Sequence, residues 1–224
     1  LYMLLVQIEI LIFVTSIGYI LFFMMDKFLS SFLRLKIFVK PTEKIELEKK
    51  VVQNADCVLV VGSTMKTEME EIGAKKTIVV ANGFDYDYNN LDLELDKKFT
   101  ITHVGTTGKN RNPRVLWQAL QKIIAQNKNF AEDCLVQLVG LTDDLVKKDI
   151  QNFQLQNNVV ISDLVPHSKA IQIQKNSIIN LLIINQTPNA KGILTGKFFE
   201  YLSVQRPILA IGPNDGDVAA ILQE

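Results

Sequence analysis

The sequence predicts an α/β protein built on parallel β-sheets, and two observations lead to this fold class. Short apolar segments with strand character alternate along the chain with segments whose apolar residues recur at helical spacing. Strands that alternate with helices in this way favour right-handed βαβ units, which place neighbouring strands in parallel. The 224 residues are 48% hydrophobic and 21% charged, a globular balance that leaves room for one large domain or two small ones.

The charge balance argues against a nucleic-acid partner. Lys and Arg together number 24, as do Asp and Glu, so the chain carries no net positive field. No basic stretch is interleaved with aromatic residues. Cys57 and Cys134 lie in or beside apolar runs and lack the spacing of metal ligands, so we expect reduced core cysteines in a cytosolic protein.

The segment 1–25 is nearly all apolar, and Glu9 is its single charge. Its length and hydropathy fit a membrane span. It also contains the strand-like run 8–14, and a helical stretch to about Leu35 follows a break at 15–18. A buried strand and a surface helix are the favoured interpretation, with a membrane span as the alternative. The helix also carries aromatic and methionine residues that suit peripheral contact with a membrane.

The next segments complete a first, partial α/β domain. We expect a helix at 42–54, a buried strand at 56–62, a short helix at 65–71 capped by Ser63 or Thr64, and a buried strand at 77–81. Residues 85–98 are rich in Asp, Asn and Tyr and show no clear period, as is typical of a linker. The predicted division is therefore a partial N-terminal domain at 1–88, a linker at 89–98 and a C-terminal domain at 99–224.

The C-terminal domain contains five predicted strands, at 100–104, 135–139, 159–161, 178–184 and 207–211. The predicted helices are at 113–127, 143–154, 168–175, about 195–203 and 217–223. In such sheets ligands bind beyond the carboxyl ends of the strands. The loops there should therefore converge on one crevice; they span 105–111, 140–142, 163–167, 185–196 and 212–216.

Two of these loops carry residues suited to a phosphorylated ligand. The loop 105–111 offers backbone amides and two cations, Lys109 and Arg111, for a diphosphate. Neither a Walker A motif nor Gly-x-Gly-x-x-Gly is present, which disfavours an ATPase or a dinucleotide enzyme.

The helix that begins near Thr195 is the second candidate. The hydroxyl of Thr195 can cap the helix, and Gly196 has no Cβ to keep a ligand from the backbone. Lys197 and the free amides of the first turn suit an anion, and Glu200 can accept hydrogen bonds from ligand hydroxyls, so the pair suggests a nucleotide. The alternative from residue types alone is a Lys/Glu pair on a solvated face.

The other polar candidates are weaker. His103 lies on a strand and is interpreted as a core histidine, whereas His167 follows Pro166 and could reach the crevice. The acidic pairs Asp143-Asp144 and Asp215/Asp217 are interpreted as helix caps in preference to metal ligands.

Several motifs together resemble the donor-binding half of group 1 (family 4) retaining glycosyltransferases of the GT-B architecture, in which two Rossmann-like domains face each other. In order along the chain they are Ala55-Asp56 through Met65, Ala81-Asn-Gly-Phe-Asp85, His103-Val-Gly105, Arg111-Asn-Pro113 with Leu116-Trp117, Leu138-Val-Gly140, Val165-Pro-His167, Thr195-Gly-Lys-Phe-Phe-Glu-Tyr-Leu-Ser203, Arg206-Pro-Ile-Leu-Ala210 and Asp215-Gly-Asp217. The resemblance extends from about Lys44 to Glu224.

The resemblance implies a transferase that moves a sugar from a UDP- or GDP-linked donor to a glycan or lipid-linked glycan, with retention and without a metal or other cofactor. By position, Glu200 would hold the ribose and Lys109 or Arg111 would neutralise the diphosphate leaving group. The loop 163–165 would contact the base. The implied donor-binding residues are Gly105, Thr106, Thr107, Val165, Thr195, Gly196, Lys197 and Glu200.

Two departures from the family pattern accompany the resemblance. Many members carry a second glutamate eight positions earlier, where this chain has Gly192. Most of an acceptor-binding domain is not found before Leu1, so we expect a fragment of a longer enzyme, which could bind donor weakly or be inactive. The expected location is the cytoplasm or the inner face of the membrane. A nucleotide-sugar epimerase of similar fold and a non-catalytic Rossmann-like interaction module are the alternatives.

Overall fold

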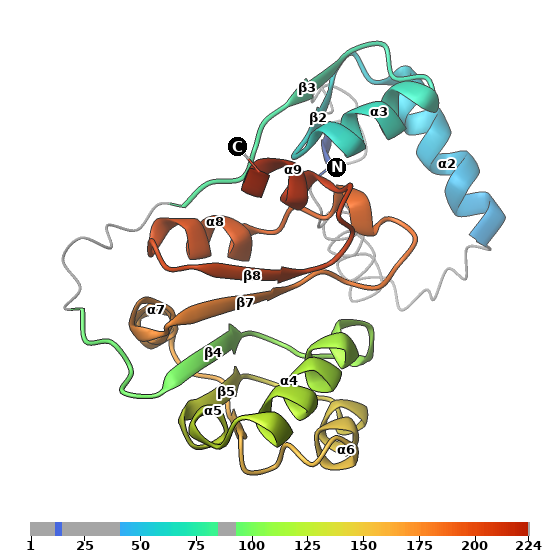
Figure 1. Ribbon diagram of the computed structural model, residues 1–224. Coiled ribbons are helices and arrows are strands. Elements are labelled where there is room, and N and C mark those ends of the chain that lie inside the picture. The colour runs from blue at the N-terminus through green and yellow to red at the C-terminus, as the bar shows by residue number, and fades with distance from the viewer. Residues whose placement is uncertain (1–11, 15–40, 85–92, 224) are drawn as a thin grey trace. The chain divides into compact units, whose positions relative to one another are not determined.

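The computed structural model describes residues 12–14, 41–84 and 93–223 (Figure 1). The chain divides into two compact units, one of residues 1–82 with 192–194 and one of residues 83–191 with 195–224. The apolar N-terminal segment except residues 12–14, the whole helix expected after it, and residues 89–92 of the predicted linker lie outside the described residues. Among the helices that are described, none is both long and apolar enough to cross a membrane.

The first unit contains a three-stranded parallel sheet in the order β1-β2-β3. Its described elements are β1 (Ile12–Val14), α2 (Pro41–Asn54), β2 (Val58–Val60), α3 (Ser63–Glu71) and β3 (Thr77–Val79). They confirm the predicted helix at 42–54 and place shorter strands inside the predicted ones. Buried Val58 and Val60 of β2 pack with Val52 of α2 and Met69 of α3, which explains the apolar spacing of those helices.

The predicted cap of α3 is wrong by one position. Gly62 occupies the N-cap position with extended backbone and no side-chain cap, and Ser63 is already the first helical residue.

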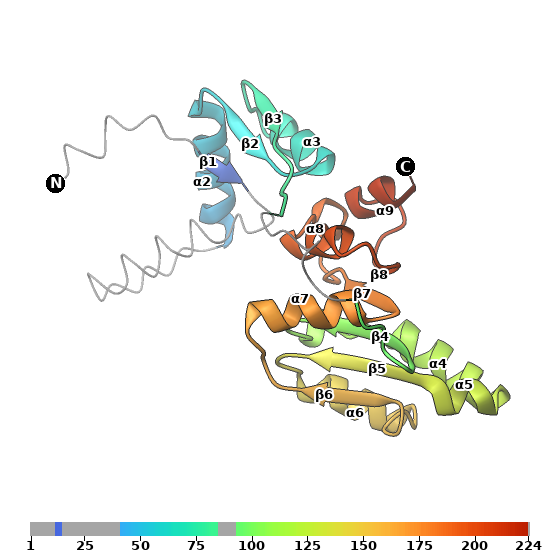
Figure 2. The same cartoon turned by 90° about the vertical axis from the view of Figure 1, so that its left-hand side faces the viewer.

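The second unit is a five-stranded parallel sheet with helices, and all five predicted strands are present (Figure 2). Its elements are β4 (Phe99–Val104), η2 (Lys109–Arg111), α4 (Arg114–Gln126), α5 (Lys128–Asp133), β5 (Cys134–Val139), α6 (Asp144–Asn152), β6 (Val159–Ser162), α7 (His167–Asn176), β7 (Ile179–Ile183), η3 (Ala190–Gly192), α8 (Gly196–Ser203), β8 (Ile208–Ile211) and α9 (Asp217–Gln223). The short elements α5, η2 and η3 were not predicted.

The strand order β6-β5-β4-β7-β8 identifies where a ligand is expected to bind. The chain builds the sheet outwards from β4, first through β5 and β6 and then on the other side through β7 and β8. The loops after β4 and β7 therefore leave the sheet in opposite directions, and this switch point is where open α/β sheets bind ligands. The parallel α/β fold class predicted from the sequence is confirmed.

Each face of this sheet has its own apolar packing. On one face, α4 and α6 pack on β4, β5 and β7, and Trp117 is completely buried there. On the other, Val104 and Val139 pack with Ala170 of α7. Cys134 is a free, buried cysteine of the first cluster, and burial raises the pKa of its thiol to about 11.

The end of the predicted linker is attached to the second unit. The amide of Asp96 donates to the Asn176 carbonyl at 2.9 Å, and its carboxylate accepts a bond from the Thr100 hydroxyl at 2.8 Å. Asp96 is therefore bonded to the end of α7 and to β4, and the domain boundaries at 88 and 98 stay a prediction.

Candidate functional site

Two glycine turns lie at the carboxyl ends of neighbouring strands β4 and β5. Gly105 after β4 and Gly140 after β5 have φ angles of +133° and +131°, which side chains rarely adopt. The Gly105 amide donates to the Val139 carbonyl at 2.7 Å. A Cβ on Gly140 would lie 2.8 Å from the Gly105 carbonyl oxygen, so the two loops pack backbone against backbone.

A cavity of about 360 Å³ lies at the switch point, between the loops after β4 and β7. It is lined by Thr106, Gly108, Lys109, Asn110, Arg111 and Asn185. The Arg111 Nε donates to Asn185 Oδ1, and the Gln186 amide donates to the Asn110 carbonyl at 2.8 Å, so the two loops are tied together. The residues that line the cavity all belong to the described part of the chain. They include two cations and no carboxylate, so the cavity suits an anionic ligand.

The residues after Arg111 have a structural role that the sequence alone did not reveal. Asn112 accepts a hydrogen bond from the buried Trp117 Nε1 at 2.9 Å and donates to the Asp149 carboxylate at 2.7 Å. Arg114 pairs with the same carboxylate at 3.1 Å. This network fixes the start of α4, and with it the C-terminal end of the cation-bearing loop.

Lys197 of α8 does not line the cavity but lies directly behind the Gly105 turn. Its ammonium donates to the Val104 carbonyl and lies 5.8 Å from the centre of the Tyr201 ring. The Tyr201 hydroxyl in turn accepts a hydrogen bond from the Val104 amide at 3.2 Å. Burial lowers the pKa of Lys197, and the nearby Glu200 carboxylate opposes this effect. Tyr201 was missed at the sequence level, although its spacing of four residues from Lys197 was visible.

His103 is a buried histidine next to these residues, as predicted. Its Nδ1 lies 2.9 Å from the Leu181 carbonyl of β7, and because a carbonyl only accepts, Nδ1 carries the proton. Its Nε2 makes no hydrogen bond among the described residues. Burial lowers the pKa of His103 to about 4, with the charges of Lys197 and Arg111 acting in the same direction.

Glu200 of α8 is held by two side chains of α7. Its carboxylate oxygens lie 3.4 Å from His167 Nε2 and 3.4 Å from Gln174 Nε2. The Glu200 side chain is 28% exposed, so a ligand can still reach it, whereas Gln174 is buried. His167 and Glu200 thus contact each other, whereas neither of them lines the cavity at the switch point. Gln174 is a partner of Glu200 that the sequence gave no signal to find.

Four other predicted site residues have distinct surroundings. Thr195 occupies the N-cap position of α8 but makes no side-chain cap, so the predicted capping bond is wrong; its hydroxyl is buried and has no hydrogen-bond partner among the described residues. Gly196 is exposed, and outside its own helix and chain neighbours no described atom lies within 4 Å of an added Cβ.

Thr107 and Val165 face inwards. Thr107 is fully buried and its amide donates to the Leu141 carbonyl at 2.8 Å, so the expected free amide is not available there. Val165 packs beside Val104 and Ala170 in the core under α7.

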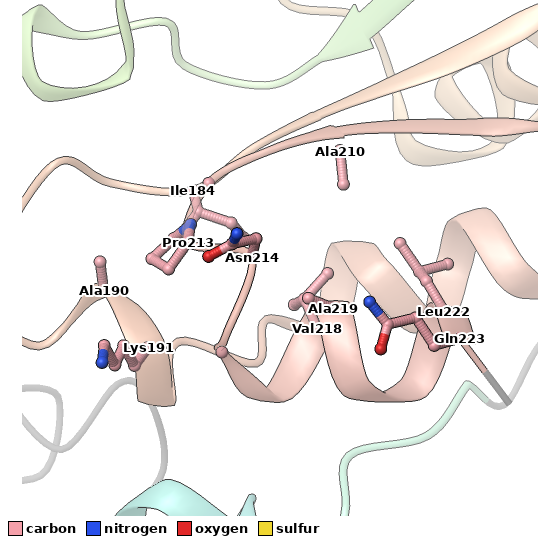
Figure 3. A pocket seen from close by; sticks show the side chains of 12 residues that line it. Ile184, Ala190, Lys191, Ala210, Pro213, Asn214, Val218, Ala219, Leu222 and Gln223 are labelled. Atoms are coloured by element: carbon pink, nitrogen blue, oxygen red, sulfur yellow. The ribbon is translucent and has the colours of Figure 1, made fainter.

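A second cavity of about 300 Å³ lies between the end of β8 and α9. Figure 3 shows Ala210 of β8 and Val218, Ala219 and Leu222 of α9 facing the same space. At its edge Lys191 pairs with Asp215 at 2.5 Å, a contact that lowers the pKa of that carboxyl. Its apolar walls set it apart from the cationic cavity at the switch point.

The acidic pairs behave largely as helix-end residues. Asp143 caps α6 by accepting the Leu145 amide at 2.8 Å, as predicted, and Asp217 opens α9. Asp215 instead pairs with Lys191. Among the described residues, no three His, Cys, Asp or Glu side chains cluster as metal ligands would.

Comparison with known proteins supports the fold at low sequence identity. No protein-family model and no curated protein sequence matches the chain. The lipopolysaccharide glycosyltransferase WaaG matches with a TM-score of 0.62 and 11% identity over 82% of this chain and 52% of WaaG. A glycosyltransferase from Rickettsia africae matches with a TM-score of 0.60 and 17% identity, over 84% of this chain and 52% of that protein.

A third match is the Anabaena protein HepE, solved with UDP and glucose, with a TM-score of 0.59 and 16% identity over 83% of this chain and 52% of HepE. This chain thus spans about half the length of these three structures. The shared fold is that of the GT-B glycosyltransferases, as the motif resemblance predicted.

Proposed function

We propose that the chain is the donor-binding part of a glycosyltransferase that uses a nucleotide-diphosphate sugar. The observation that carries this proposal is the cavity at the switch point. It lies where open α/β sheets bind ligands, and Lys109 and Arg111 reach it from a loop that starts at the Gly105 turn. A diphosphate fits the charge of this lining.

In this proposal the two cations act on the leaving group. As the bond between the sugar and the diphosphate breaks, negative charge grows on the diphosphate, and preorganised cations stabilise it most when the cavity excludes water. Arg111 is held in place by Asn185, whereas Lys109 is exposed and can follow the phosphate. The enzyme would need no metal or other cofactor for this role.

The remaining contacts of the donor are assigned by position. Glu200, oriented by His167 and Gln174, would bind the ribose hydroxyls, and the open backbone at Thr195 and Gly196 would face the phosphates. The loop at 163–165 would contact the base, with Val165 supporting it from the core rather than touching the ligand.

The whole enzyme would transfer a hexose with retention to a glycan or lipid-linked glycan acceptor, in the cytoplasm or at the inner face of the membrane. These features come from the family resemblance. The fold of WaaG and HepE, of which the first takes part in lipopolysaccharide biosynthesis and the second was solved with UDP and glucose, is consistent with them.

Calorimetric titration of the chain with UDP and with GDP tests the proposal. We expect saturable binding of one of them, and Arg111→Met should weaken it by about ten- to a hundredfold, since a hydrogen bond to a charged group contributes ~1.5–3 kcal/mol. Lys122→Met, which removes an exposed cation from α4, is the matched control and should leave the affinity unchanged. If neither nucleotide binds at millimolar concentration, the proposal is wrong and a non-catalytic interaction module is favoured.

A further inference from the structure

The β4–β7 ladder ends early at the switch point. Strand β4 pairs with β5 along its whole length, up to Val104 beside Val139. Its described pairing with β7 stops at Thr102 beside Asn180. The Gly105 amide bonds to the Val139 carbonyl on the β5 side, and in a parallel strand successive residues direct their backbone groups to alternate neighbours. The amide and carbonyl of Val104 therefore face the β7 side, beyond the last described pair.

Two side chains of α8 take the place of the missing strand partner. The Tyr201 hydroxyl accepts the Val104 amide hydrogen at 3.2 Å, and the Lys197 ammonium donates to the Val104 carbonyl. Lys197 and Tyr201 are four residues apart, so they lie on the same face of the helix. Tyr201 is completely buried, and a buried backbone group without a partner is costly, so both contacts are needed at this position.

The residue that follows Val104 begins the cation-bearing loop. Gly105 has a φ of +133°, and a Cβ placed on it would lie 2.8 Å from Lys197 Nζ. The ammonium thus contacts the turn itself as well as the carbonyl before it. The direction in which the loop 105–111 leaves the sheet is fixed by contacts from α8.

We propose that Lys197 and Tyr201 are positioning residues that hold the phosphate-binding loop by bonding both backbone groups of Val104, which couples this loop to the helix that carries Glu200. The nucleotide part of the inference rests on the proposed function; the structural part does not. Lys197 then acts on the diphosphate through the loop and not by direct contact. One helix would place both the ribose acceptor and the phosphate loop.

Hydrogen–deuterium exchange of the free protein tests the structural part. Lys197→Met keeps the aliphatic stem and removes the charge, and Tyr201→Phe removes only the hydroxyl. We expect the amides of 105–111 to exchange about tenfold faster or more in either variant, as loss of a buried hydrogen bond implies, while β5 stays protected. Lys148→Met, an exposed lysine of α6, is the matched control and should change neither region.

Titration with UDP and UMP tests the coupling to the nucleotide. Both variants should lower the affinity for UDP more than that for UMP, because the loop is assigned to the diphosphate. A general loss of stability would instead lower both affinities alike. Unchanged exchange of 105–111 in both variants would overturn the inference, as would an unchanged ratio of UDP to UMP affinity. If the unmodified chain binds GDP instead of UDP, GDP and GMP take the place of UDP and UMP in this titration. If it binds neither UDP nor GDP, the proposed function fails, and the exchange experiment still decides whether α8 holds the loop.

Discussion

The substitution Gly196→Ala should raise the stability of the protein and lower its affinity for a nucleotide. Gly196 is the first residue of α8, and its φ is not in the left-handed region. Beyond its own helix and chain neighbours, no atom of the described residues lies within 4 Å of an added Cβ. Alanine is favoured over glycine in a helix by ~1 kcal/mol in the interior, so about half of that is a fair expectation at the first position. For a chain of this size the melting temperature should rise by about 1–2 °C.

The expected loss of affinity follows from the same open space. If a phosphate oxygen accepts a hydrogen bond from the backbone at the start of α8, the new methyl group occupies the space that the phosphate needs. Loss of one hydrogen bond to a charged group costs about 1.5–3 kcal/mol, which weakens binding by about ten- to a hundredfold. Differential scanning calorimetry gives the stability, and titration with UDP or GDP gives the affinity.

A variant with unchanged affinity would refute the assignment of the α8 start to the phosphates, since it would show that the ligand does not approach Gly196. A variant that loses stability as well would show that the methyl group disturbs the fold, and the affinity would then carry no information about contact. The two measurements on one protein separate these outcomes.

Two further predictions concern stability. Gly140→Ala should destabilise the protein more than Gly105→Ala does. Backbone strain of about 1–3 kcal/mol applies to both variants. The new Cβ of Gly140→Ala, however, meets a backbone carbonyl at 2.8 Å, whereas that of Gly105→Ala meets the end of the Lys197 side chain at 2.8 Å. Equal midpoints in urea unfolding would contradict this. Folding lowers the pKa of His103 from 6.5 to about 4, so the unfolded chain binds the proton more readily than the folded chain. The free energy of unfolding should therefore drop as the pH falls from 6.5 to 4. The expected drop is ~3 kcal/mol, at 1.36 kcal/mol per pH unit. His103→Asn, whose amide can still donate to Leu181, should flatten this part of the profile of unfolding free energy against pH; an unchanged slope would show that other groups cause it.

The five strands of the second unit and the glycine turns at their carboxyl ends could be predicted because they depend on local signals, whereas the order of the strands in the sheet was not predicted. Largely apolar runs of three to seven residues locate the strands, and Gly105 and Gly140 locate two of the turns at their carboxyl ends. Parallel βαβ connections then bring those turns to one edge whatever the details of packing. Elements such as α5 (Lys128–Asp133) escaped prediction because six residues are too few to show a helical period.

The partners of the polar side chains could not be predicted, because they depend on groups far away in the sequence. Thr195 has a good capping residue type at the N-cap position, yet its buried hydroxyl makes no hydrogen bond to any part of the chain that the structure describes. Thr107 follows a glycine turn as a phosphate-binding residue would, yet its amide pairs with Leu141 on the neighbouring loop. In both cases the residue type fits the predicted role, and tertiary packing determines the contact.

The polar residues of α8 illustrate how these contacts change the interpretation of a sequence motif. Lys197 and Glu200 are three residues apart, and from the sequence alone a solvated ion pair was the simpler interpretation. In the structure both are half-buried and turn to different partners: Lys197 to the end of β4, and Glu200 to His167 and Gln174 of α7. Lys197 thus connects α8 to the end of β4, where the loop 105–111 begins, and Glu200 connects the same helix to α7. A substitution that displaces α8 as a whole should therefore disturb both neighbours together, whereas Lys197→Met should act mainly on the loop 105–111.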